Sequence, residues 1–282
     1  MSIHEETLSG RDFSRLSAFV YEEAGIRLGP EKRTMLEARL RRRLHSLHLD
    51  SYRQYCEYLF TPRGRSEEIV AFLDVVTTNK TDFFREPGHF TFLAERALPE
   101  LAPRAEGRPL LVWSAGCSSG EEPYTLAMVL SEYGEAHPGF RFRILATDLS
   151  TRVLEKAQAG IYTAESVEPV PPELRRKYLM RSRQPGSNQV RVVPELRRLV
   201  EFRRLNFMDA DYGLAGQADA IFCRNVIIYF DRATQEAILR KLTRQLIPMG
   251  YLFVGHSETL HDMQLPLTAI GPALYRKSHG HG

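Results

Sequence analysis

Residues 113–124, with the sequence WSAGCSSGEEPY, place small and acidic residues between an apolar run at 110–112 and a helical pattern at 126–130. Strand, glycine-bearing loop and helix in this order typically form a cofactor cradle at the carboxyl edge of a parallel sheet. Gly116 and Gly120 lack a Cβ atom, so the backbone there could approach a ligand closely. The first amides of the helix would point at a polar group of that ligand.

Two carboxylates in this loop, Glu121 and Glu122, indicate which ligand it suits. A pyrophosphate would be repelled by them, and the segment has neither a Gly-Lys-Ser/Thr ending nor a Gly-x-Gly-x-x-Gly pattern. Carboxylates fit a cofactor that offers hydroxyls and an ammonium group, and S-adenosylmethionine offers both. The alternative is that both acids only complement the helix dipole.

Polar residues also follow the other predicted strands. Asp148 ends the alternating run 142–147, where an acid typically binds ribose hydroxyls, although it could be a plain turn residue. Asn206 follows a strand ending near Arg203 and would reach the adenine edge from the same side. A buried strand at 219–223 ends in Arg224 and Asn225, again at the carboxyl edge.

The segment 77–87, TTNKTDFFREP, is dense in hydrogen-bonding side chains. Thr81 or Asp82 could simply cap a helix whose first turn holds Pro87. A cap needs only one polar residue, however, and this segment has several around an aromatic pair. Arg85 would suit the carboxylate of a methionyl group or of a substrate.

Bulk properties limit the class of protein. The chain has 282 residues, 43% of them hydrophobic, and a formal charge of +3. No apolar run is long enough to span a membrane, so we expect no membrane insertion. The three cysteines are far apart and form no CxxC pair, so we expect a reducing cytoplasm and no metal site.

Residues 1–76 read as helix throughout and predict a small bundle. One of its helices carries a cationic stripe formed by Arg39, Arg42 and Arg43. A solvated helix face is one explanation. We favour an acidic partner surface, either nucleic acid or a glutamate-rich protein, because few acids accompany the arginines.

After residue 90 the pattern alternates between strands and helices, which predicts an α/β domain. Strands are expected at 110–114, 142–147, 218–223 and 250–255, and helices near 88–101, 121–136, 150–158 and 232–246. The alternation breaks over about 162–204, where β-rich stretches at 190–193 and 199–202 predict a small antiparallel insert. Such an insert could bind an extended peptide by strand addition, or it could be decorative.

Five motifs in this order resemble the chemotaxis receptor methyltransferase family, CheR. They are TTNxTxFFRE, WSAGCSSGEEPYTLAM, ILATDLSTRVLEKAQAGIY, FCRNVIIYFD and GYLFVGHSE, and the resemblance covers about residues 8–276. It implies a helical domain at 1–76, a linker at 77–90 that contributes to the cofactor site, and at 91–282 a Rossmann-like class I methyltransferase domain that carries the insert.

The resemblance also implies the reaction, which is S-adenosylmethionine-dependent methylation of glutamate side chains on chemoreceptors. The implied cofactor contacts are Asn79, Thr81, Arg85, Glu121, Asp148, Asn206, Phe207, Arg224 and Asn225. Arg39, Arg42 and Arg43 would then dock the acidic receptor helices, and a receptor C-terminal peptide could bind the insert. A glutamate is ionised at neutral pH, so no general base is required, and Arg224 or Tyr229 could orient it.

Two other functions remain as alternatives. A nucleic-acid methyltransferase would use the arginines on phosphate and bind more weakly at high salt. A receptor-binding adaptor without activity would have lost cofactor residues, yet every expected position holds a suitable type. We therefore expect a cytoplasmic, monomeric enzyme that does not bind nucleic acid.

Overall fold

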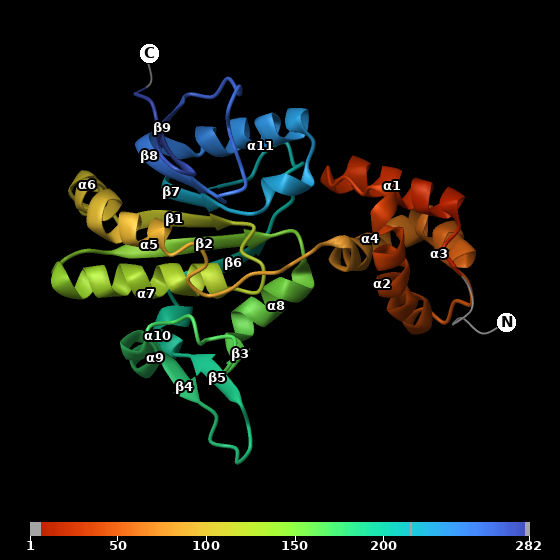
Figure 1. Cartoon of the computed structure of the whole chain (residues 1–282), viewed down its shortest axis with the longest axis horizontal. Helices are drawn as coiled ribbons and strands as arrows, with labels where there is room; N and C mark the ends of the chain where they lie inside the picture. Colours follow the sequence, from red (N-terminus) through yellow and green to blue (C-terminus); the bar gives the residue numbers. More distant parts are fainter. Residues whose placement is uncertain (1–6, 215, 280–282) are drawn as a thin grey trace.

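The computed structural model describes residues 7–214 and 216–279, which form a helical bundle, a larger α/β domain and a small β insert (Figure 1). The bundle contains α1 (Gly10–Ala24), α2 (Arg33–Ser46), α3 (Tyr52–Leu59) and α4 (Pro62–Val76), with a 3₁₀ turn at Pro30–Lys32. Side chains of Ser9, Ser51 and Thr61 cap three of these helices, as short hydroxyl residues do at N-termini. Leu36, Leu40 and Leu44 recur at helical spacing and are fully buried in the core of the bundle.

The α/β domain is built on a seven-stranded sheet in the order β6-β2-β1-β7-β8-β10-β9. The strands are β1 (Leu110–Ala115), β2 (Phe142–Asp148), β6 (Val200–Arg204), β7 (Ala218–Cys223), β8 (Leu246–Val254), β9 (Leu267–Gly271) and β10 (Leu274–Lys277). The first five pair in parallel, and the last two are antiparallel additions at one edge that the sequence did not predict. The chain runs outward from β1 to β6 and returns to β7, so the order reverses between β1 and β7. Ligands typically bind at such a reversal.

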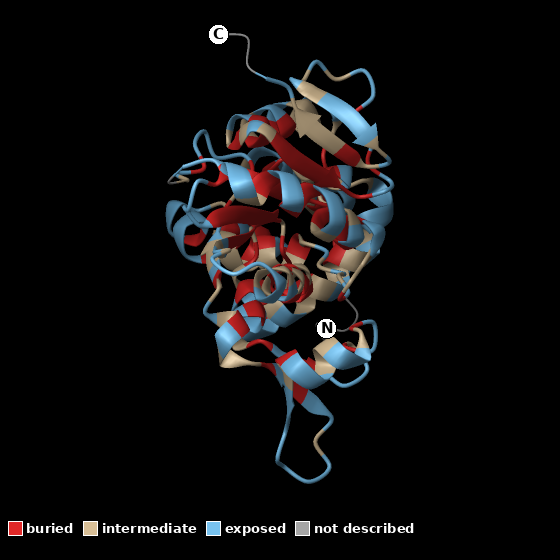
Figure 2. Ribbon diagram, turned by 90° about the vertical axis from the view of Figure 1, so that its left-hand side faces the viewer, coloured by how far each residue is buried: buried red, intermediate tan, exposed pale blue. Residues whose placement is uncertain are grey.

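Helices cover both faces of this sheet, and its strands are buried between them (Figures 1 and 2). The helices are α5 (Gly88–Phe92), a π turn (Leu93–Ala97), α6 (Leu98–Arg104), α7 (Glu121–Ala136), α8 (Thr151–Ala159), a 3₁₀ turn (Ile227–Tyr229) and α11 (Arg232–Arg244). Alternate residues of β1 belong to two cores: Val112 is in the core that includes Leu126 of α7, and Trp113 is in the core that includes Leu239 of α11. The strand is therefore apolar throughout, as expected for a parallel strand covered on both faces.

The insert is smaller than the sequence predicted. It contains β3 (Ile161–Thr163), α9 (Pro172–Tyr178), β4 (Leu179–Arg181), β5 (Gln189–Val192) and α10 (Pro194–Arg197), and its three strands form an antiparallel sheet in the order β3-β5-β4. The β-rich stretch at 199–202 was wrongly assigned to the insert, because β6 pairs in parallel with β2 in the main sheet. Composition alone could not separate a short edge strand of one sheet from a strand of the other.

The predicted fold class is confirmed: a helical domain precedes an α/β domain with a small antiparallel insert.

Contacts join the two domains at several points. The Tyr21 hydroxyl donates to Asp231 at 2.5 Å, and the amide of Arg27 donates to the Tyr229 carbonyl at 3.1 Å. Across the described residues, no helix combines the length and apolar character needed to cross a bilayer.

Candidate active site

A cavity of about 360 Å³ lies between the helical bundle and the carboxyl edge of the sheet. Its walls come from the loop between α1 and α2, the junction after α4, and the loops that follow β1, β2, β6 and β7. The predicted residues that line it are Asn79, Thr81, Arg85, Asp148, Asn206, Phe207, Arg224, Asn225 and Tyr229. The edge where the strand order reverses is therefore also where the predicted residues gather.

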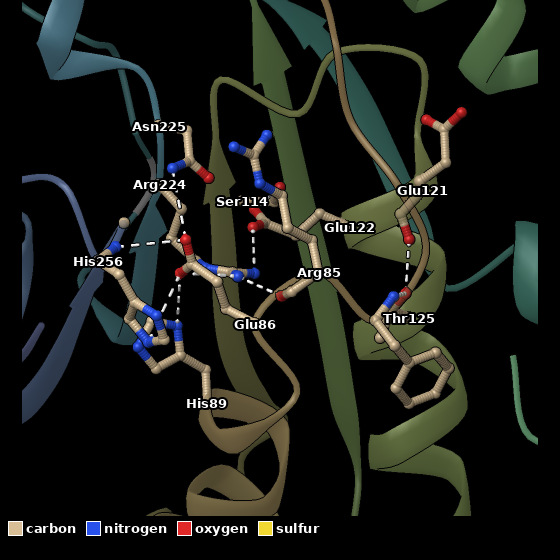
Figure 3. Close-up of polar contacts among 12 residues, drawn as sticks. Arg85, Glu86, His89, Ser114, Glu121, Glu122, Thr125, Arg224, Asn225 and His256 are labelled. Atoms are coloured by element: carbon tan, nitrogen blue, oxygen red, sulfur yellow. Dashed lines mark hydrogen bonds and ion pairs between the residues drawn. The ribbon is translucent and has the colours of Figure 1, made fainter. Parts of the chain in front are cut away.

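In the loop after β1, Glu122 and not Glu121 faces the cavity. Glu122 lines the cavity and accepts a hydrogen bond from the Ser114 hydroxyl at 2.7 Å, whereas Glu121 is not part of the cavity wall. The Glu121 carboxylate instead accepts from the Ser119 hydroxyl at 2.7 Å and lies 3.9 Å from Lys156. In Figure 3 the Glu121 carboxylate points away from Glu122 and Arg224. The prediction that Glu121 faces the cofactor is therefore not supported by this geometry. Sequence could not decide which of two adjacent helical residues points inward.

The glycines of this loop also have different roles. Gly116 lines the cavity at φ +89°, and a Cβ atom there would lie 2.4 Å from Cγ2 of Val226. Only glycine therefore lets the loops after β1 and β7 meet. A Cβ on Gly120 would instead meet Tyr162 and Ala157, away from the cavity, so this glycine serves packing.

Asp148 stands at the end of β2 with both carboxylate oxygens held by backbone amides. Ser118 N donates to Oδ2 at 2.8 Å, and Ser150 N donates to Oδ1 at 3.0 Å. Burial raises the pKa of Asp148, and these amides act against that rise by favouring the charged form. The amide of Leu149 also bonds this carboxylate, and because a carboxylate has about four lone-pair positions, one remains that could accept a ribose hydroxyl.

Arg224 is buried beside the cavity between two carboxylates. Its guanidinium lies 3.0 Å from Glu122 Oε2 and 3.1 Å from Glu86 Oε2, and it also donates to the Arg85 carbonyl (Figure 3). Burial acts to raise the pKa of Glu86, but the Arg224 charge and the His256 amide bring it below its usual value. Arg224 therefore joins the junction segment to the loop after β1, and its buried Nε–H has no hydrogen-bond partner among the described residues.

The loop after β7 is held by a carboxylate that the sequence reasoning did not single out. Glu258 accepts the amides of Gly255, Asn225, Val226 and Ile227 at 2.6–2.8 Å. Among these residues Asn225 has φ +57°, a left-handed conformation that asparagine tolerates better than most residues. Glu258 and Glu86 both lie inside motifs that carried the family resemblance, and this is the signal that could have found them.

The junction after α4 forms one side of the cavity. The Asn79 amide donates to the Thr77 hydroxyl at 3.2 Å, and the Asn79 carbonyl accepts from the Ser118 hydroxyl at 3.0 Å. Arg85 donates to the Lys80 carbonyl at 3.2 Å, and Thr81 lies on the same wall. The predicted clustering of this segment with the loop after β1 is thus present in the structure.

The opposite wall joins the two domains. Asn206 was expected to reach an adenine edge, but its amide nitrogen donates to the Glu23 carbonyl of α1 at 2.6 Å. Phe207 is buried beside it, and Tyr229 lies half-buried on the same wall. Ile26 and Met35 of the bundle add apolar surface to this wall. The bundle therefore encloses the cavity that the sheet edge opens.

The arginines of α2 do not form a free stripe. Arg39 donates to the carbonyls of Val75, Val76 and Thr77 at 2.9–3.1 Å and so caps the end of α4. Arg43 pairs with the buried Glu68 at 2.5 Å, whereas Arg42 is exposed. Of the three arginines expected to dock a partner, only Arg42 is exposed. Arg39 and Arg43 hold the bundle together instead.

Both cysteines near the cavity are buried. Burial raises the pKa of each thiol, Cys117 and Cys223, well above the ordinary value for cysteine, so neither is a thiolate at neutral pH. The cavity instead offers hydrogen-bond acceptors for hydroxyls and an ammonium group, and Arg85 for a carboxylate. These acceptors, together with Arg85, fit the polar groups of S-adenosylmethionine.

Comparison with known proteins agrees with this geometry. Residues 11–77 match the family model "CheR methyltransferase, all-alpha domain", and residues 79–272 match "CheR methyltransferase, SAM binding domain". The chain is 42% identical over 271 residues to the chemotaxis protein methyltransferase of Escherichia coli, covering 96% of this chain and 92% of that one. It is 40% identical over 265 residues to chemotaxis protein methyltransferase 2 of Pseudomonas aeruginosa, covering 94% and 92%.

One solved structure, a magnesium protoporphyrin IX methyltransferase from Synechocystis with bound S-adenosylmethionine, matches at 14% identity and a TM-score of 0.32, covering 78% of this chain and 91% of that one. That similarity is too low to add to the argument. The two family matches together span most of the described residues, and they meet at the junction that lines the cavity. The chain belongs to the CheR family, and it is an S-adenosylmethionine-dependent methyltransferase.

Proposed function

We propose residue roles for the reaction of this family, the transfer of a methyl group from S-adenosylmethionine to glutamate carboxylates of chemoreceptors. The observation that carries the proposal is the shared cavity, whose wall includes both Asp148 and the segment 77–85. Asp148 accepts the ribose hydroxyls, and Asn206 with Phe207 borders the adenine. Arg85 binds the methionyl carboxylate, and Asn79, Thr81 and Asn225 complete the contacts.

The substrate glutamate is ionised at neutral pH and is already a nucleophile, so the enzyme has to place it rather than deprotonate it. Tyr229 is suited to orient the incoming carboxylate, because it lies on the cavity wall that faces the bundle. Arg224 also lines the cavity and is a proposed cofactor contact, and it positions Glu122 and the Arg85 backbone. Glu121 supports the loop after β1 from outside the cavity.

Receptor docking is proposed for the exposed face of α2, where Arg42 is free, with Arg39 and Arg43 adding positive charge next to it. The methylation helices of receptors carry the glutamates that such a face would attract. A receptor C-terminal peptide is proposed to pair with the insert, where β4 is an edge strand of a three-stranded sheet. We further propose a cytoplasmic monomer that binds no nucleic acid.

The test is calorimetric titration with S-adenosylhomocysteine, followed by radiolabelled methyl transfer to receptor-bearing membranes. Micromolar binding and base-labile label on the receptors support the proposal, because glutamate methyl esters hydrolyse in base. Binding without transfer to receptors would contradict the proposed substrate. Failure to bind would contradict the proposed cofactor contacts.

A further inference from the structure

Three side chains meet where the junction segment enters α5 and where β8 ends, outside the cofactor cavity. Glu86, His89 and His256 each offer a ligand atom, and these atoms all lie within 4.8 Å of one another. The Oε2 atom of Glu86 is 3.5 Å from His89 Nδ1 and 4.0 Å from His256 Nε2 (Figure 3). None of the three lines the cavity. The cluster therefore lies behind the cavity wall, next to the cavity-lining residues Arg224 and Asn225 that donate to Glu86.

His89 is the member that the fold by itself does not explain. Its side chain is 2% exposed, and although the Pro272 backbone interacts with the ring, neither ring nitrogen forms a hydrogen bond of good geometry among the described residues. The ring packs edge-on against Phe253 and His256, at centroid distances of 5.6 and 5.1 Å. Burying an imidazole without a partner is costly, and native proteins rarely leave such groups unsatisfied. A ligand at the centre of the cluster would satisfy Nδ1.

The kind of ligand follows from the donors. Two imidazoles and one carboxylate are the set that three-ligand Zn²⁺ sites use, with water in the fourth position. Tetrahedral ligands at about 2.0 Å from zinc lie roughly 3.3 Å from one another. The distance of 3.5 Å from Glu86 to His89 is close to that value, and the exposed His256 can approach by a side-chain rotation. We propose that Glu86, His89 and His256 form a Zn²⁺-binding site.

Arg224 shares the carboxylate of Glu86, and the site must accommodate its charge. Glu86 accepts from Arg224, from the Asn225 amide and from the His256 backbone. A carboxylate has about four lone-pair positions, so one remains for a metal ion. Arg224 also has Glu122 as a second carboxylate at 3.0 Å, which limits its repulsion of the ion. An ion here would tie the start of α5 to the end of β8.

The test uses the full chain, purified without an affinity tag and stripped of metal with a chelator. Zn²⁺ is titrated in competition with a chromogenic chelator, and Co²⁺ binding is followed by visible absorption, which reports low coordination number. The expected result is about one ion per chain. His256→Ala should weaken binding at least about tenfold and remove the Co²⁺ bands, since it deletes a ligand. His256 is 57% exposed, so this variant should fold.

Matched controls separate this site from the other histidines. His261→Ala removes an even more exposed histidine that lies near His256 in the chain, and His279→Ala with His281→Ala removes the last two histidines of the sequence. Both should keep the wild-type affinity. Equal affinity of the His256→Ala variant and the wild type, or loss of binding in a control instead, would overturn the proposal. Because no methylation assay is involved, this result is independent of the proposed function.

Discussion

At the scale of single residues, buried carboxylates organise this site by accepting backbone amides. Asp148 holds the loops after β1 and β2 together, and Glu258 collects the amides of the loop after β7. Burial raises the pKa of Glu258, and its backbone amides act against that rise. Hydrogen bonds to a charged group are stronger than neutral ones, so both residues position the cavity walls.

We expect Asp148→Asn to weaken S-adenosylhomocysteine binding by about 1.5–3 kcal/mol, the value of a hydrogen bond to a charged group. Asparagine keeps one acceptor for Ser118 or Ser150, so the fold should survive. Calorimetric titration gives the affinity. The exposed Asp262→Asn is the control, and equal affinities for both variants would remove Asp148 from the cofactor site.

The substitution Glu258→Gln should weaken the loop after β7. The amide oxygen of glutamine can accept only some of the backbone amides that now bind Glu258, and its NH₂ group would face the remaining donors. We expect the free energy of unfolding to fall by about 3 kcal/mol, measured by urea denaturation. The half-buried Glu236→Gln loses only an i,i+4 ion pair with the half-exposed Arg240 and should change the free energy of unfolding little. A similarly small change for Glu258→Gln would mean that the loop does not depend on Glu258.

At the scale of elements, α2 combines a structural face with an exposed one. Arg39 and Arg43 lie one turn apart and bind the end of α4 and its buried Glu68. Arg42, between them in sequence, faces solvent. Adjacent arginines of one helix thus have different roles because the helix turns their side chains toward different surroundings.

Substituting these arginines should separate the two roles. Arg43→Met leaves the Glu68 charge buried and unpaired, which is expected to lower the free energy of unfolding by about 3–5 kcal/mol. Arg42→Met should change it by less than about 0.5 kcal/mol, while lowering methyl transfer to receptors. Denaturation and transfer assays on both variants test this. Unchanged transfer by a folded Arg42→Met variant would contradict the docking role.

At the scale of the whole molecule, the cavity exists only because two domains close on each other. Asn206 binds the Glu23 carbonyl, and the loop of Arg27 pairs with the Tyr229 backbone. Gly25 at the end of α1 packs so closely that a Cβ atom would lie 2.7 Å from the sulfur of Met208. A ligand in the cavity therefore contacts both domains and should stabilise their arrangement.

This predicts a pattern of hydrogen exchange on ligand binding. S-adenosylhomocysteine should slow exchange in residues 24–29 of the bundle and 77–85 of the junction, since both segments contribute to the cavity wall. The insert strands at 179–192 should be unchanged, because they lie away from it. Exchange measured by mass spectrometry tests this. Protection confined to the α/β domain would show that the bundle is not part of the site.

The sequence alone determined the α/β class, the helical domain and most of the polar residues around the cavity. These features follow from local rules. The spacing of apolar residues along the chain distinguishes helices from strands, and parallel strands bring their carboxyl ends to one edge of the sheet. The order of a strand followed by a polar residue was therefore sufficient to predict that Asp148 and Arg224 would lie at this edge.

Only the tertiary structure decided the rest. It showed that Glu122 faces the cavity in place of Glu121, that β6 belongs to the main sheet, and that Arg39 and Arg43 are bound internally. It also brought Glu86 and His89 together with His256 from a distant part of the chain. The physical reason is common to all four: each depends on which surface a side chain or strand meets, and that surface is formed by residues far away in sequence.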